Sequence, residues 1–335
     1  MGPVPADQGN LMTAVVIPCY KVRETILQVI TDIGPEVDLI VLVDDACPDG
    51  TAAYVESHCR DPRVQIIRHD RNRGVGGAVI TGYRAGIKAG ADILVKVDGD
   101  GQMDTSLIPL LIRPIKNGVA DYTKGNRFFF LETLACMPKK RLIGNAILSF
   151  MNKFSSGYWK IFDPTNGYTA IHASIAARLP LEKISERYFF ESDMLFRLNT
   201  LRAVVIDIPM HARYGDEVSN LVIRDIIGEF FGKHIRNTFK RFFYNYYLRG
   251  MSVASVELPL GALLFVFGCI FGLYHWVISI SSGAPATAGT VMIAGLSILT
   301  GLQLLLSFIG TDMASEPIHA AHLTSLGVTH KKDSI

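Results

Sequence analysis

Short apolar runs alternate with amphipathic segments through the first third of the chain. The runs predict strands at 13–20, 37–46, 64–69 and 91–100, and the segments predict helices at 24–34, 51–59, 76–90 and 105–118. The predicted strands are apolar along their length, without the alternation of a half-exposed sheet. The pattern therefore predicts an α/β fold whose mostly parallel sheet is covered by helices on both faces.

Polar and glycine-rich clusters follow the predicted strands. They span residues 18–20, 43–50, 71–77 and 98–104. In open parallel sheets, ligands bind in the crevice at the carboxyl ends of the strands. We therefore expect one crevice to collect residues from all four clusters.

Two long apolar segments lie near the end of the chain. Residues 258–280 and 288–310 contain no Asp, Glu, Lys or Arg, and each is long enough to cross a bilayer as a helix. The alternative, two buried core helices, would need two unusually long helices in tandem. Basic residues flank the outer ends of the pair: Lys233, Arg236, Lys240, Arg241 and Arg249 before it, and Lys331 and Lys332 after it. These flanks place both outer ends on the cytosolic side and the linker outside.

The segment 232–250, which precedes the first apolar run, interleaves Phe and Tyr with Lys and Arg. This mixture is typical of a helix that lies in the membrane interface. A solvated basic helix packed on the α/β domain is the alternative, and the sequence leaves both interpretations open.

Composition narrows the class of protein. The chain has 335 residues, of which 49% are hydrophobic, and most of the apolar excess follows residue 257. The net charge of +2 gives no reason to expect nucleic-acid binding. The five cysteines form no Cys-x-x-Cys pair, which favours reduced thiols in a cytosol-facing protein. The first residues lack the basic and apolar regions of a signal peptide.

The stretch VKVDGDGQMD, residues 95–104, ends an apolar run with three carboxylates. In an extended strand, residues two apart point the same way, so Asp98 and Asp100 are expected to present two carboxylates to one point. With Gln102 they offer hard oxygen ligands suited to Mg²⁺ or Mn²⁺, which take further ligands from phosphate oxygens. A diphosphate ligand is therefore expected, and a turn rich in Asp and Gly is the alternative.

Six motifs in order resemble the A-type glycosyltransferases of family 2. They are VVIPCYK, VDDACPDGT, RNRGVGGAVITGYRAG, VKVDGDGQMD, KGNRF and FDPTNGYTA, within residues 13–220. The likeness is greatest to the polyprenyl-phosphate branch, which includes dolichol-phosphate mannose synthase and bacterial undecaprenyl-phosphate glucosyltransferases. The resemblance implies a GT-A (Rossmann-like) sheet, followed by an interfacial amphipathic helix and two transmembrane helices.

The resemblance also implies roles for individual residues. Positions matching the family's nucleotide-sugar contacts are Pro18, Tyr20, Asp44, Asp45, Asp98 and Arg127. Asp98, Asp100 and Gln102 match the metal and diphosphate site, and Arg127 matches an arginine that meets the diphosphate. The Asn-Glu pair usual after the tyrosine is replaced by Lys21 and Val22, so one carboxylate contact is missing or replaced.

A second group of matching positions concerns the acceptor. Arg141 matches a basic residue that holds the acceptor phosphate, and Arg213 and Ser219 match a loop that closes over the phosphates. Asp163 and Asp193 are candidates for carboxylates that orient groups near the sugar.

Structural alternatives exist for several of these residues. Asp44 and Asp45 would serve equally well as caps of the following helix, and Tyr20 as a packed aromatic residue. The cluster that ends at Arg141 also fits a solvated face or a lipid-headgroup patch. Asp193 and its neighbour Glu191 are as compatible with an ion-paired role as with a catalytic one.

Together these features predict an inverting, metal-dependent transfer of a hexose from a UDP- or GDP-linked sugar to a polyprenyl phosphate at the cytosolic membrane face. The rivals are a membrane glycosyltransferase acting on a lipid hydroxyl or glycan, and a non-catalytic partner subunit of the same fold. A bacterial inner-membrane location is expected, without nucleic-acid partners, and relatives in this branch suggest a homo-oligomer such as a tetramer.

The expected domain organisation follows the same boundaries. It comprises a flexible N-terminus (1–12), a GT-A catalytic domain (13–220), a juxtamembrane amphipathic helical region (221–256), a two-helix transmembrane hairpin (257–311) and a cytosolic C-terminal tail (312–335).

Overall fold

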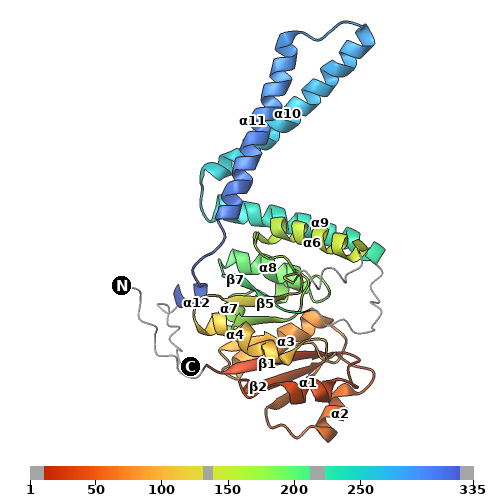
Figure 1. Ribbon diagram of the computed structural model, residues 1–335, viewed down its shortest axis with the longest axis vertical. Coiled ribbons are helices and arrows are strands. Elements are labelled where there is room, and N and C mark those ends of the chain that lie inside the picture. Colours follow the sequence, from red (N-terminus) through yellow and green to blue (C-terminus); the bar gives the residue numbers. More distant parts are fainter. Residues whose placement is uncertain (1–10, 131–138, 212–222, 325–335) are drawn as a thin grey trace. The chain divides into compact units, whose positions relative to one another are not determined.

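The computed structural model describes residues 11–130, 139–211 and 223–324 (Figure 1). The chain divides into two compact units, which are described separately below. The first unit comprises residues 1–238 and 317–335, and the second comprises residues 239–316.

A seven-stranded sheet forms the centre of the first unit. Its strands are β1 (Thr13–Cys19), β2 (Leu39–Asp44), β3 (Val64–Arg68), β4 (Ile93–Lys96), β5 (Tyr122–Asn126), β6 (Thr169–His172) and β7 (Val205–Pro209). Their order is β3-β2-β1-β4-β6-β5-β7. Only β6 runs antiparallel to its neighbours, so the predicted mostly parallel sheet is confirmed.

Helices cover both faces of this sheet (Figure 1). The helices described in this unit, besides α9, are α1 (Ile26–Asp32), α2 (Thr51–His58), α3 (Val75–Lys88), α4 (Ile108–Lys116), α6 (Lys139–Ser156), α7 (Ala173–Arg178), α8 (Phe190–Thr200) and α12 (Ala321–Thr324). Of these, α6 packs on α8 and not on the sheet. Alternate residues of β1 enter opposite cores. Val16 packs in the cluster that contains Tyr83 of α3, whereas Ile17 packs in the cluster that contains Ile26 of α1. Burial on both faces explains why the strands are apolar throughout.

The strand predicted at 91–100 is shorter than expected. β4 ends at Lys96, and Asp98 and Asp100 lie in the turn that follows it. Gly101 adopts the left-handed backbone with φ +76°, which side-chain-bearing residues rarely adopt. The turn is also tied to the start of α1, because Thr25 Oγ1 donates a hydrogen bond to the Gly99 carbonyl at 2.6 Å. The extended geometry assumed for the two carboxylates is therefore wrong.

The second unit contains two long apolar helices, α10 (Val253–Ser282) and α11 (Ala288–Ala314). Their mean hydropathy is 2.1 and 2.0 in the most apolar window, so both qualify by length and composition as membrane spans, as the sequence predicted. They pack closely where Gly301 meets α10, since a Cβ on Gly301 would lie 2.5 Å from the Phe265 backbone nitrogen. Small residues at such crossings are typical of helices packed within membranes.

A buried ion pair joins the ends of this unit. Helix α9 (Ile223–Phe243) starts in the first unit and ends in the second, where a π-helical turn (Tyr244–Leu248) follows it. Arg241 donates two hydrogen bonds to the carboxylate of Asp312, at 2.7 and 2.9 Å, and both side chains are fully buried. Tyr246 also donates its hydroxyl to Asp312 at 2.7 Å.

The segment after α11 packs back onto the first unit. Asp121, fully buried, accepts hydrogen bonds from the backbone nitrogens of Ala321 and His322, both at 2.8 Å, and lies 2.7 Å from His322 Nδ1. The His322 ring stacks on His172 with centroids 4.3 Å apart. This part of the predicted tail is therefore anchored to the sheet.

Candidate active site

One edge of the sheet gathers the polar clusters that follow the strands. β1 is parallel to β2 and β4, and β6 is antiparallel to both β4 and β5, so β5 runs in the same direction as β4. The carboxyl ends of these four strands therefore lie at the same edge. β2 and β3 lie on one side of β1, and β4 lies on the other, so the strand order reverses between β1 and β4. Open α/β sheets form their ligand crevice at such a reversal.

Asp44 and Asp45, at the end of β2, are buried and hold neighbouring backbone. Asp44 accepts hydrogen bonds from the nitrogens of Cys47 at 2.7 Å and Ala52 at 3.2 Å, so it caps the start of α2. This is the capping alternative that the sequence left open for Asp44.

Asp45 holds the loop that leads into α3. Its carboxylate accepts hydrogen bonds from the nitrogens of Arg73 at 2.8 Å and Gly74 at 2.7 Å, and lies 2.7 Å from His69 Nδ1. Protein donors thus surround this carboxylate. Contacts of Asp44 and Asp45 with a nucleotide remain predictions.

Tyr20, at the end of β1, is 45% exposed, so its ring is available at the edge of the sheet instead of packed in the core. The next residue, Lys21, has a left-handed backbone with φ 59°, which is strained for a residue with a side chain. Its nitrogen donates to Cys47 Sγ at 2.8 Å, a contact that ties the end of β1 to the loop after β2. Pro18, which lies in β1 two residues before Tyr20, is partly exposed.

A buried lysine stands beside the acidic turn. Lys96 is 1% exposed, and its Nζ lies 2.8 Å from Asp98 Oδ1 and 3.5 Å from Glu191 Oε1. Burial alone would lower the pKa of Lys96, but the two carboxylates outweigh burial and raise that pKa above its usual range. Gly167 approaches this cluster so closely that a Cβ there would collide with Lys96 Nζ.

Sequence reasoning gave Lys96 no role, although a lysine inside the apolar run ILVKV was a visible signal. A charge on a strand buried on both faces requires a partner within the fold. The structure supplies two partners, and one of them, Glu191, comes from α8.

The acidic turn fits a divalent cation that a ligand helps to hold. Asp98 Oδ1 is buried and lies 2.8 Å from Lys96 Nζ, but it accepts no hydrogen bond with suitable angles. Asp100 Oδ1 accepts one from the Gln102 nitrogen at 3.0 Å. Within the described part of the chain, no three His, Cys, Asp or Glu side chains converge to form a metal site by themselves. Two carboxylates completed by phosphate oxygens match the preference of Mg²⁺ and Mn²⁺.

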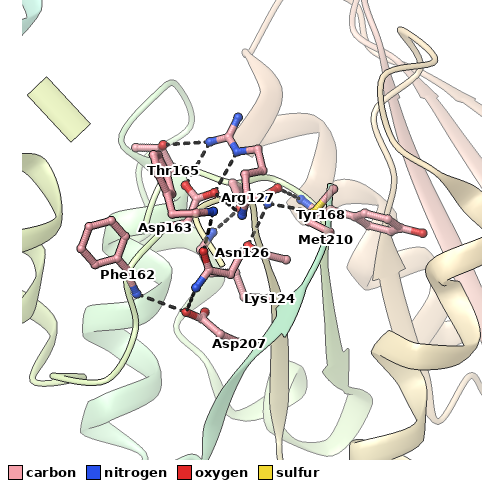
Figure 2. Close-up of polar contacts among 12 residues, drawn as sticks. Lys124, Asn126, Arg127, Phe162, Asp163, Thr165, Tyr168, Asp207 and Met210 are labelled. Atoms are coloured by element: carbon pink, nitrogen blue, oxygen red, sulfur yellow. Dashed lines mark hydrogen bonds and ion pairs between the residues drawn. The ribbon is translucent and has the colours of Figure 1, made fainter. Parts of the chain in front are cut away.

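Arg127 and Asp163 form a two-pronged ion pair at the same edge (Figure 2). Arg127 Nε lies 2.8 Å from Asp163 Oδ2, and a terminal guanidinium nitrogen lies 3.0 Å from Oδ1. The backbone nitrogen of Arg127 donates to the same carboxylate at 3.2 Å. Asp163 is fully buried, whereas the Arg127 side chain is 26% exposed, so the carboxylate fixes a guanidinium that still reaches solvent.

Two further charged residues, the buried Lys124 and the partly buried Asp207, lie near Arg127 (Figure 2). Burial lowers the pKa of Lys124 to about 8, and its Nζ donates to the carbonyl of Asn166. Burial also raises the pKa of Asp207 to about 6. Asp207 accepts hydrogen bonds from Asn126 Nδ2 at 2.9 Å and from the Phe162 nitrogen at 3.2 Å. These contacts tie β5, β7 and the loop before β6 into one support for Arg127.

Of the remaining predicted residues, the structure describes the side chain of Asp193 but not those of Arg141, Arg213 and Ser219. Asp193, in α8, is buried and bonded to the Ser185 nitrogen at 3.0 Å and Asn237 Nδ2 at 3.1 Å, which favours the paired alternative. Arg141 lies in the first turn of α6, and its side chain is outside the described part of the structure. Arg213 and Ser219 also lie outside the described residues.

Two shallow depressions lie on the first unit. One, of about 300 Å³, follows β3 at the edge that carries Asp45, and it is lined by Arg68, His69, Asp70, Arg71 and Arg73. The other, of about 390 Å³, lies against α3 and α7 and contains no predicted site residue. The smaller one lies beside the candidate site, since His69 and Arg73 of its lining contact Asp45.

Comparison with known proteins decides the family. The family model described as glycosyl transferase family 2 matches residues 14–179. The undecaprenyl-phosphate mannosyltransferase of Micrococcus luteus is 32% identical over 200 residues, which cover 58% of this chain and 81% of that protein. The chain belongs to glycosyl transferase family 2.

Further relatives support the same branch and the same fold. This family 2 glycosyltransferase is 29% identical over 213 residues to the UDP-N-acetylglucosamine–dolichyl-phosphate N-acetylglucosaminyltransferase of Methanococcus voltae, covering 59% of this chain and 84% of that protein. Glucosyl-3-phosphoglycerate synthase from Mycobacterium tuberculosis, solved with Mn²⁺ and UDP, superposes with a TM-score of 0.50 at 18% identity. The superposition covers 69% of this chain and 80% of that one, and it confirms the fold.

Family membership makes this chain an enzyme that transfers sugars, as the sequence predicted.

Proposed function

We propose that this protein transfers a hexose, with inversion, from a UDP- or GDP-linked sugar to a polyprenyl phosphate such as undecaprenyl or dolichyl phosphate. The observation that carries the proposal is the single sheet edge that brings the acidic β4 turn and the fixed Arg127 together. The relatives support the acceptor class, since one is an undecaprenyl-phosphate mannosyltransferase and another acts on dolichyl phosphate.

The nucleotide sugar would lie along this edge. Exposed Tyr20 and Pro18 at the end of β1 are proposed to contact the nucleotide, with Asp44 and Asp45 shaping the loops beside it. Arg127, held by Asp163, would face the diphosphate. Because the guanidinium is fixed before the substrate arrives, it needs little reorganisation when charge develops.

Asp98, Asp100 and Gln102 would hold Mg²⁺ or Mn²⁺ beside the diphosphate. When bound, such a cation offsets the negative charge that develops on the leaving group. Lys96, whose Nζ lies 2.8 Å from Asp98 Oδ1, would orient this carboxylate from the protein side. Asp163 is proposed to position Arg127, and Asp193 to hold α9 through Asn237.

The acceptor chemistry requires no strong base. A phosphate monoester has a second pKa of about 6, so at neutral pH it already carries a nucleophilic anionic oxygen. Correct placement then suffices, unlike transfer to a hydroxyl group, which must lose its proton. Arg141, Arg213 and Ser219 are the residues we propose for that placement. Attack opposite the departing diphosphate would invert the anomeric carbon.

The membrane arrangement is part of the proposal. The two candidate spans would anchor the chain in a bacterial inner membrane with the sheet in the cytosol. The chain is further proposed to be a homo-oligomer such as a tetramer. Modification of the linker at 283–287 by an impermeant reagent would place that linker, and cross-linking in membranes would count the subunits.

The direct test incubates membranes containing the full chain with a panel of UDP- and GDP-sugars and a short-chain polyprenyl phosphate. Lipid products are identified by mass. We expect one donor to yield a hexosyl phosphoprenol, and Asp98→Asn to abolish that product. Transfer only to a lipid hydroxyl or a glycan would replace the proposal with the first rival. No transfer from any donor would support the non-catalytic rival.

A further inference from the structure

One buried lysine at the sheet edge is shared by two carboxylates. Lys96 Nζ lies 2.8 Å from Asp98 Oδ1 and 3.5 Å from Glu191 Oε1. The Lys96 side chain is buried, whereas the Asp98 side chain is 30% exposed. Asp98 therefore contacts the buried ammonium and also reaches the open edge of the sheet, where a cation and a diphosphate would approach.

Glu191 is held in place by the packing of α8. Its neighbour Phe190 and the residue Met194, one turn further on, are buried in the same core cluster as Tyr83 of α3. Glu191 is itself buried, and among the described residues Lys96 is the cation with which it forms an ion pair. A buried charge is costly unless it is paired. Glu191 and Lys96 therefore stabilise each other, whether or not Asp98 binds a further ligand.

Little space surrounds the Lys96 ammonium. A Cβ on Gly167 would collide with Lys96 Nζ and would lie 3.0 Å from Asp98 Oδ2. In the described part of the chain, Asp98 and Glu191 are the two carboxylates that form ion pairs with Lys96. The ammonium can therefore remain paired in two ways, by contact with Asp98 or by a short shift towards Glu191.

The two arrangements differ in what they leave at the acidic turn. An ammonium in contact with Asp98 offsets part of the negative charge that attracts a divalent cation, and like charges repel strongly away from bulk water. Asp98 Oδ1 is also the buried oxygen that accepts no hydrogen bond with suitable angles. A shift of Lys96 towards Glu191 would leave this oxygen to the cation while the ammonium stays paired.

We propose that Lys96 and Glu191 are positioning residues that set the affinity of Asp98 for the divalent cation. Lys96 lowers this affinity while it contacts Asp98, and Glu191 raises it by accepting Lys96 when the cation binds. Oxygens of the diphosphate then supply further ligands, so that uptake of the cation depends on the donor. This role rests on the cation site contained in the proposed function.

The test measures binding of Mn²⁺ to the purified full chain, without nucleotide and at a fixed concentration of UDP or GDP, from the free-ion electron paramagnetic resonance signal. Glu191→Gln leaves Lys96 with Asp98 alone, so the affinity for Mn²⁺ with nucleotide should fall about 10-fold. Lys96→Met removes the opposing charge, so the affinity without nucleotide should rise by a similar factor. Glu186→Gln removes an equal charge that pairs with Arg73 instead, and this control should bind Mn²⁺ like the wild type.

A double variant separates this role from a purely structural one. Combining Lys96→Met with Glu191→Gln removes both buried charges and makes the test independent of the stability of Lys96→Met alone. The double variant should bind Mn²⁺ at least as tightly as the wild type, because Glu191 acts only through Lys96. Circular dichroism checks that each variant is folded.

Unchanged Mn²⁺ affinity in Glu191→Gln would overturn the proposal. Weaker binding by the double variant than by the wild type would also overturn it, since Glu191 would then act on the cation directly or Lys96 would serve only to orient Asp98. Uptake of Mn²⁺ by the wild type together with unchanged variants contradicts this role alone, whereas no uptake with either nucleotide contradicts the cation site of the proposed function itself.

Discussion

Helices α3 and α6 belong to the same folded unit, yet they bury opposite kinds of side chain. α3 buries Val79, Ile80 and Tyr83 against the sheet, as a helix of a water-soluble α/β domain does. α6 exposes Ile147 and Phe150 and buries hydroxyl and amide groups. The difference teaches that one folded unit holds its helices in two ways, α3 by apolar packing on the sheet and α6 by contacts of hydroxyl and amide groups.

The contrast separates two parts of the first unit. The sheet and α3 pack as in a water-soluble α/β domain, and the sheet edge carries the acidic turn and Arg127. α6 and the first-unit part of α9 instead expose apolar side chains, among them Ile147, Phe150 and Phe231.

The largest expected effect concerns the buried charge next to the sheet. Lys96→Met removes the partner of the buried Glu191 and of the partly exposed Asp98, and leaving a buried carboxylate without its cation costs about 3–5 kcal/mol of unfolding free energy. Lys88→Met, at the exposed end of α3, is the control and should unfold like the wild type. Denaturant unfolding of the purified proteins in one detergent measures both. Equal stability of the two variants would contradict a buried, interacting Lys96.

Two matched substitutions, Ile80→Ala in α3 and Ile147→Ala in α6, test the difference between these helices. Ile80→Ala in α3 should lower the unfolding free energy by about 2–5 kcal/mol, because it leaves a cavity in a packed core. Ile147→Ala in α6 should change it by less than about 0.5 kcal/mol in detergent, since this side chain contacts solvent. A large loss for Ile147→Ala would mean that α6 is packed against protein.

The third prediction concerns catalysis at the sheet edge. Asp163→Asn keeps the shape of the side chain but removes the charge that orients Arg127, so sugar transfer should slow by about 10- to 100-fold, the effect of losing roughly 1.4–2.7 kcal/mol of transition-state stabilisation. Arg127→Lys should be impaired as well, because lysine cannot make the two-pronged contact. Initial rates of lipid glycosylation measure both, and wild-type rates for Asp163→Asn would exclude the positioning role.

The smallest effect is the pH dependence of stability that arises from His234, whose Nδ1 lies 2.7 Å from Ser155 Oγ in a buried contact between α9 and α6. Burial lowers the pKa of His234 to about 4, so between pH 6.5 and 4 the unfolded chain binds a proton that the folded chain does not. The contribution of His234 is therefore complete above pH 6.5 and is lost as the pH falls through this window. Unfolding of wild type and His234→Gln should diverge less at pH 5 than at pH 7. A constant difference between them would contradict a buried neutral histidine.

The sequence predicts the first four strands and the spans because their signals are local, whereas β5, β6 and β7 were not predicted. Apolar runs mark the strands, and the absence of charge marks α10 and α11. The predicted end of β4 is wrong, because the strand ends at Lys96 and not at residue 100. Where the turn begins depends on tertiary contacts such as the hydrogen bond from Thr25 Oγ1 to the Gly99 carbonyl.

The site was only partly predictable, since its decisive contacts are distant in sequence. Arg127 and Asp163 were each singled out, but their pairing depends on the register of β5 and β6. Glu191 reaches Lys96 only because α8 packs against the sheet. The sequence also does not predict which side of α6 is buried. Its Ser, Asn and apolar residues are compatible with burial of either the polar or the apolar side.

The central claim is that a divalent cation joins the β4 turn to the diphosphate of the donor. Titration of Mn²⁺ into the purified full chain with UDP or GDP present, followed by the free-ion electron paramagnetic resonance signal, tests it most directly. The account predicts nucleotide-dependent uptake of Mn²⁺ that Asp98→Asn and Asp100→Asn each abolish while both variants remain folded. Uptake that is unchanged in both variants, or absent from the wild type with either nucleotide, would contradict it.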